Sequence, residues 1–108
     1  MMQIAPNKVA EIIILAREGD RGEAELDAFV QRLSEEEQAE LVALFWIGRG
    51  SFEAEEWDDA VQTAIESASA PTEDYLKGSP HLADHLEAGL EALGIDSSVV
   101  EDDLYRAG

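Results

Sequence analysis

The segment His81-Leu82-Ala83-Asp84-His85 places two histidines and a carboxylate at a spacing that could do metal chemistry. Histidines at positions i and i+4 of a helix share one face and can bind one metal ion together. The pattern differs by one carboxylate from the H-x-x-E-H signature of inverted zinc peptidases, which also requires a third protein ligand and uses glutamate as the base. His81, His85 and Asp84 are therefore weak metal candidates, and a metal-dependent hydrolase is one functional hypothesis.

The structural interpretation of the same segment is a pair of surface histidines among carboxylates. Neighbouring carboxylates favour the protonated imidazole, and a protonated histidine binds metal poorly. The sequence contains no cysteine, which removes disulfides, thiolate catalysis and cysteine-ligated zinc from consideration. It also has no phosphate-binding glycine loop followed by Lys-Ser/Thr and no nucleophile elbow. We therefore expect no cofactor, no catalytic residue and no enzymatic activity.

The composition is strongly acidic, because 25 Asp and Glu against 7 Lys and Arg give a formal net charge of −18. Such a chain repels the phosphates of nucleic acid and the headgroups of anionic membranes, so we expect neither as a partner. A basic protein surface is the partner that this field favours. Residues 51–108 hold 15 acidic and 2 basic side chains, a net charge of −13, which raises the hypothesis of an acidic decoy or inhibitor of a basic protein. Solubility alone is the alternative explanation.

Length and hydropathy predict one acidic helical domain over residues 1–108, since 45% of the residues are hydrophobic. The first residues lack the charged and apolar regions of a signal peptide. The longest apolar runs are far shorter than the roughly 20 residues that span a bilayer. We therefore expect a cytoplasmic protein.

The densest apolar run, Leu41–Ile47, predicts the central element of the fold. Ser34 and Glu37 form a capping-box pattern, which begins a helix over about 34–47. From residue 41 onward this helix has almost no polar face, and a helix that is apolar all round is buried. The sequence therefore predicts an all-α, compact bundle of about five to six short helices around this central helix.

The segment Gly48-Arg49-Gly50 is predicted to end the central helix. A glycine just past a helix usually adopts the left-handed conformation, so we assign that role to Gly48. Arg49 has two interpretations. The structural one is an ion pair with the acidic turn that follows, and the functional one is contact with an anion or a partner.

The surrounding helices are indicated by apolar residues at a spacing of three and four. The segments with this spacing are 6–18, 23–33, 54–68, 73–77, 80–93 and a last one that ends near 105. Thr72 is the expected N-cap of the fourth, and Ser79 is that of the fifth, with Pro80 at its first position.

Two hydrophobic staples are predicted by apolar pairs that flank a capping residue. Phe52 and Trp57 stand on either side of the N-cap candidate Glu53, so their rings are expected to pack together. Ile95 and Val100 repeat the pattern before the last helix.

Three segments together resemble a small bacterial family catalogued as a domain of unknown function, number 3775 of that series. They are Glu36–Gly50, Phe52–Trp57 and Tyr75–Leu86, within residues 34–94, and the Trp-Ile-Gly-Arg-Gly stretch is the most specific part. The resemblance implies a small helical cytoplasmic protein. It implies no activity, cofactor or catalytic residue.

The leading hypothesis is a non-enzymatic protein–protein interaction module. Its expected contact surface lies where the apolar side chains Ile14, Leu15, Trp46 and Ile47 cannot all be buried, ringed by acid. Arg49, Trp46 and Trp57 are the interaction candidates. The partner is an unidentified protein, basic in the decoy alternative, and a homodimer through the same surface is a further alternative.

Overall fold

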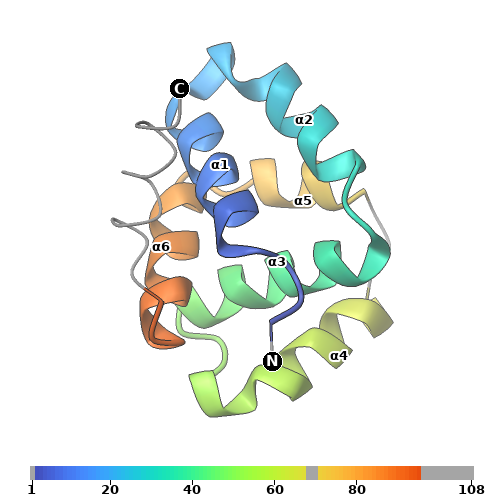
Figure 1. Ribbon diagram of the computed structural model, residues 1–108, viewed down its shortest axis with the longest axis vertical. Coiled ribbons are helices and arrows are strands. Elements are labelled where there is room, and N and C mark those ends of the chain that lie inside the picture. The colour runs from blue at the N-terminus through green and yellow to red at the C-terminus, as the bar shows by residue number, and fades with distance from the viewer. Residues whose placement is uncertain (1, 68–70, 96–108) are drawn as a thin grey trace.

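Helix α3, Glu35–Gly48, crosses the middle of the molecule, with α4 on one side and α1, α2 and α5 on the other (Figure 1). The computed structural model describes residues 2–67 and 71–95. Within those residues the chain forms six α-helices and two short 3-10 turns and no strand, which confirms the predicted all-α class. The remaining elements are α1 Pro6–Arg17, η1 Gly19–Arg21, α2 Glu23–Gln31, η2 Ala54–Glu56, α4 Trp57–Ser67, α5 Thr72–Lys77 and α6 Leu82–Ala92.

The predicted capping box begins α3. The backbone N–H of Glu37 donates to the hydroxyl of Ser34 at 3.1 Å, and the Glu37 carboxylate accepts from the Ser34 N–H at 3.0 Å. Two backbone donors that a helix start leaves unpaired are thereby satisfied. Residues 39–45 of this helix are all buried, in agreement with the apolar run.

The end of α3 differs from the prediction, because Gly50 and not Gly48 takes the left-handed conformation, with φ of 89°. The N–H of Ser51 donates to the Trp46 carbonyl at 2.9 Å and the N–H of Gly50 to the Ile47 carbonyl at 3.1 Å. This is the hydrogen-bond pattern of a Schellman motif with Arg49 as the C-cap.

Gly48 instead belongs to the helix and lies where α3 meets α6. A Cβ at Gly48 would lie 2.6 Å from the carbonyl carbon of His85 and 3.0 Å from the backbone nitrogen of Gly89. A Cβ at Gly89 would in turn lie 3.1 Å from the carbonyl carbon of Leu44. The two glycines therefore let the backbones of α3 and α6 approach closely, which brings the buried Leu86 and Leu90 of α6 into the core.

Helix α4 begins later than predicted. Glu53 is the N-cap of a 3-10 turn, Ala54–Glu56, whose capping box is closed by Glu56, and the α-helix starts only at Trp57. Because a 3-10 turn has fewer residues per turn than an α-helix, Trp57 does not reach the staple position opposite Phe52. Trp57 packs into the core with 3% of its surface exposed.

The predicted N-caps of α5 and α6 were wrong. Thr72 is the first residue of α5, preceded by Pro71, and its hydroxyl donates to the side-chain carbonyl of Gln38 on α3 at 3.1 Å. Ser79 precedes a turn at Pro80 and His81, so that α6 starts at Leu82 and His81 is its N-cap. The Ile95–Val100 staple, the last helix to residue 105 and the end of the 54–68 segment lie outside the described residues.

The structure also contains a buried carboxylate that the sequence did not indicate. Glu40 on α3 is 2% exposed, and its oxygens accept hydrogen bonds from the backbone N–H of Gln3, at 2.8 and 2.9 Å, and of Ile4, at 2.7 Å. Ile4 itself is fully buried. Glu40 thus fixes the segment before α1 against the central helix.

No helix in the described ranges combines the length and the apolar character needed to cross a bilayer.

Candidate functional site

An apolar groove of about 590 Å³ lies between α3, α4 and α5. One stripe of α3 at helical spacing forms its floor, and α4 and α5 form its two walls. Its lining residues are Glu35, Gln38, Ala39, Val42, Trp46, Ala64, Ile65, Ser67, Pro71, Thr72, Glu73 and Tyr75.

The walls of this groove carry the two large apolar side chains that are most exposed among the described residues. Ile65 on α4 is 51% exposed and Tyr75 on α5 is 43% exposed. Ile65 follows the apolar spacing of the buried Trp57, Ala60 and Ala64 along α4 but remains exposed. An isolated exposed apolar side chain is ordinary, whereas two that face one groove form a surface suited to contact.

Trp46 connects the floor of the groove to both neighbouring segments. Its ring stacks on Phe52, with centroids 5.7 Å apart and an interplanar angle of 26°, and its indole N–H donates to the Tyr75 hydroxyl at 2.9 Å. Phe52 therefore pairs with Trp46 and not with the predicted partner Trp57. These two contacts hold the indole in place, so the groove is formed before any partner arrives.

The side-chain amide of Gln38, at the centre of the polar contacts on the floor of the groove, is already paired. The side-chain amide nitrogen of Gln38 donates to the carbonyls of Val30, at 2.9 Å, and Leu33, at 3.3 Å. Its amide oxygen accepts from Thr72, as described above. A partner would therefore meet mainly apolar surface there.

A second, acidic groove of about 510 Å³ runs between α3 and α4 on the other side of Ile65. Glu35 and Ile65 line both grooves, and Glu36, Glu40 and Asp58 line the acidic one. Neither groove has Lys or Arg among its described lining residues. Ile65 therefore stands as an apolar ridge between an apolar and an acidic surface.

The interaction candidates from the sequence have separate positions in the structure. Trp46 lines the apolar groove, whereas Trp57 is a core residue, 3% exposed, that is among the residues lining the acidic groove. Of the apolar residues expected at the surface, Leu15 and Ile47 are buried, with 4% and 6% of their surface exposed. Ile14 is partly exposed on α1 and lines none of the described cavities.

Arg49 makes different contacts from the predicted ion pair. Its Nε donates to the Ser51 hydroxyl at 2.8 Å, and its guanidinium lies 5.0 Å from the centroid of the Phe45 ring. No ion pair joins Arg49 to the described residues of the acidic turn at 53–56. The Schellman motif turns the chain so that the short Ser51 side chain, rather than a carboxylate, lies next to the guanidinium.

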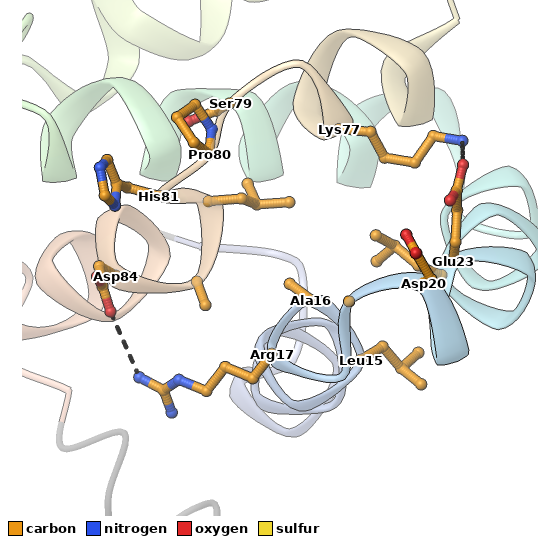
Figure 2. A pocket seen from close by; sticks show the side chains of 14 residues that line it. Leu15, Ala16, Arg17, Asp20, Glu23, Lys77, Ser79, Pro80, His81 and Asp84 are labelled. Carbon is orange, nitrogen blue, oxygen red and sulfur yellow. Dashed lines mark hydrogen bonds and ion pairs between the residues drawn. The ribbon is translucent and has the colours of Figure 1, made fainter.

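The metal candidates lie around a separate, polar pocket of about 470 Å³ between the end of α1, α2 and the segment before α6 (Figure 2). His81 and Asp84 line it, and Figure 2 shows the Arg17 side chain extended toward Asp84, with a separation of 3.8 Å. Arg17 also pairs with Glu87 at 2.7 Å. The carboxylate candidate is thus already next to a cation.

The other side of this pocket carries a second compensated charge. Lys77 contacts Asp27 at 2.9 Å and Glu23 at 3.1 Å, and the hydrogen bonds that its ammonium donates to these carboxylates, first Asp27, raise the pKa of Lys77. Lys77 and Arg17 thus both contact carboxylates of this chain.

His81 is the N-cap of α6 and His85 lies in its first turn, so the two histidines of the predicted pair are neighbours at the start of this helix. Their rings meet edge to face with centroids 6.2 Å apart, and His85 packs edge to face on Phe45 at 5.4 Å. No group of three or more histidine and carboxylate side chains in residues 2–67 and 71–95 is placed to hold one metal ion. The described residues therefore do not supply the third ligand that the zinc signature needs.

Sequence reasoning missed Ile65, Tyr75 and the buried Glu40. The spacing of apolar residues at three and four positions shows which side chains share a helix face, but it does not show whether a neighbouring element covers that face. A glutamate within an acidic helix start has no local feature that would reveal a partner 36 residues away.

The comparisons with known proteins agree with the resemblance. A family model described as "Protein of unknown function (DUF3775)" matches residues 23–95, which include α2 through α6 and both grooves. No curated protein and no solved structure matches the chain. Because the family model covers well over half of the chain, the protein belongs to this family of proteins of unknown function.

Proposed function

We propose that the protein is a non-enzymatic interaction module that binds another protein through the groove between α3, α4 and α5. The observation that carries the proposal is the convergence of Trp46, Ile65 and Tyr75 on one preformed apolar groove. Aromatic and large apolar side chains in a desolvated pocket supply most of the binding energy in protein interfaces. The paired side-chain amide of Gln38 on the groove floor adds little desolvation cost for an apolar ligand.

A catalytic alternative has less support. The pocket that holds His81 and Asp84 lacks a third metal ligand among the described residues, and both of its cations face carboxylates of this chain. The decoy alternative is favoured by one observation, the net charge of −18, and would make electrostatic attraction the main source of affinity. Binding that survives far above physiological ionic strength cannot be mainly electrostatic, so salt dependence separates the two.

The experiment compares proteins that co-purify with the wild-type chain, with Ile65→Glu and with Ile14→Glu. The two variants add the same charge, but only the first adds it to the groove. We expect a partner that is retained by the wild type and Ile14→Glu and is lost from Ile65→Glu. Identical sets of captured proteins for all three would contradict the proposal, and light scattering would reveal whether the partner is a second copy of this chain.

A further inference from the structure

We propose that the occupant of the apolar groove is an amphipathic helix that carries Lys or Arg along one flank of its apolar stripe. This inference rests on the proposed function, because it names the partner of the same groove. It is carried by the shape of the groove, by the hydrogen bonds already formed inside it and by the charge of the neighbouring surface.

The apolar part of the surface suits a helix of a few turns. The floor of the groove is a stripe of α3, and Ile65 and Tyr75 project on opposite walls. Apolar side chains at i, i+3, i+4 and i+7 of a partner helix form a stripe of the same kind. Such a helix would lie with its stripe toward Val42 and Trp46.

The hydrogen bonds of the groove disfavour the other common peptide-binding modes. A proline-rich peptide has no internal hydrogen bonds, so its carbonyls need donors from an aromatic groove. Here the indole N–H of Trp46, the donor such a groove would offer, already donates to Tyr75. An extended peptide needs a sheet edge, and the described residues contain no strand. A helix satisfies its own backbone and needs neither.

The charge around the groove selects a basic helix. Glu35, Glu36 and Asp58 are exposed, line the acidic groove and make no ion pair with the described residues. On the opposite wall, Glu73 accepts a hydrogen bond from the neutral side-chain amide of Gln31 at 2.7 Å and makes no ion pair with the described residues. More of the uncompensated charge therefore lies on the Ile65 side, where three carboxylates line the acidic groove, than on the opposite wall, where Glu73 lines the apolar groove. Lys or Arg residues on the matching flank of the partner would face these carboxylates.

The test is selection of displayed random peptides about 16 residues long, roughly four helical turns, against the wild-type protein. We expect enriched sequences with apolar residues at i, i+3, i+4 and i+7 and with Lys or Arg concentrated on one side of that stripe. Their dissociation constants should rise at least about tenfold with Ile65→Glu and stay unchanged with Ile14→Glu, as for a residue at the centre of an interface.

The charge is tested by Glu35→Gln, with Glu25→Gln as the matched control, since both glutamates lie in the first turn of a helix and are exposed. Glu35→Gln should lower the affinity for the selected peptides about two- to fivefold at low salt and reduce the salt dependence of their binding, whereas Glu25→Gln should change neither. Equal effects of the two variants would show that net charge, not this flank, attracts the peptide and would overturn the inference.

Two further outcomes separate the inference from the proposed function. Enriched peptides that lose affinity with Ile65→Glu but are proline-rich, or carry no basic flank, would overturn the basic helix while leaving the groove as the binding site. Peptides whose affinity is the same for the wild type and Ile65→Glu, or no enrichment at all, would overturn both.

Discussion

Replacing Gly48 by alanine should destabilise the protein, although alanine is the better helix former. The new Cβ would lie 2.6 Å from the carbonyl carbon of His85, and the atoms it meets belong to the backbone of α6, so no side-chain rotation can relieve the contact. Overpacking a core costs about 1–3 kcal/mol, and a backbone contact places this case at the upper end of that range. The higher helix propensity of alanine offsets about 1 kcal/mol of this loss in unfolding free energy.

The expected net loss is therefore about 2 kcal/mol of unfolding free energy. For a domain of this size the melting temperature should fall by roughly 8–16 °C. Thermal unfolding followed by far-ultraviolet circular dichroism measures this shift. A melting temperature of Gly48→Ala equal to or above that of the wild type would refute the close approach of α3 and α6.

Asparagine distinguishes this role of Gly48 from that of a cap. Asparagine tolerates the left-handed conformation better than other residues with a side chain, and nothing lies within 4 Å of a Cβ built at Gly50. Gly50→Asn should therefore change stability little, whereas Gly48→Asn should be at least as destabilising as Gly48→Ala. A larger loss of stability in Gly50→Asn than in Gly48→Asn would indicate that Gly48 is the left-handed cap after all.

Three further predictions concern the carboxylates and the arginine of α3. The hydrogen bond from Lys8 is the main cause that lowers the pKa of Glu37. The stabilisation by ionised Glu37 is therefore present above the ordinary carboxyl pKa and is lost as the pH falls through the lowered pKa. In pH-dependent denaturation, the difference in unfolding free energy between the wild type and Glu37→Gln should be constant at neutral pH and should close below about pH 4. Glu40→Gln should cost about 1.5–3 kcal/mol and accelerate hydrogen exchange of the Ile4 amide, and unchanged protection of that amide would contradict the buried anchor. Arg49→Ala should cost about 0.5–1 kcal/mol through the lost cation–π contact and leave partner binding intact, whereas unchanged stability with loss of the partner would assign Arg49 to the binding site.

The central helix and its start could be predicted because their causes are local. The capping box depends on two residues three positions apart, and a run of apolar residues without a polar face reports burial directly. The predicted starts of α4, α5 and α6 were less accurate, since each start depends on contacts with another element. Thr72, for example, donates to Gln38 on α3 instead of capping its own helix.

The candidate site was predictable only in part for the same reason. Trp46 was one of four apolar residues that were not all expected to be buried, and the structure places it in the groove. The sequence could not separate it from Trp57, because burial depends on the 3-10 turn that precedes α4. The exposure of Ile65 follows from how closely α4 approaches α3, which apolar spacing along one helix does not determine.

The most direct test of the groove as a binding site is a chemical-shift map of isotope-labelled protein titrated with the protein partner or with a selected peptide. We predict that the largest shifts fall on Val42, Trp46, Ile65 and Tyr75, and that Ile65→Glu abolishes them. Shifts centred on the polar pocket of His81 and Asp84, with Ile65→Glu binding as tightly as the wild type, would contradict the proposed function.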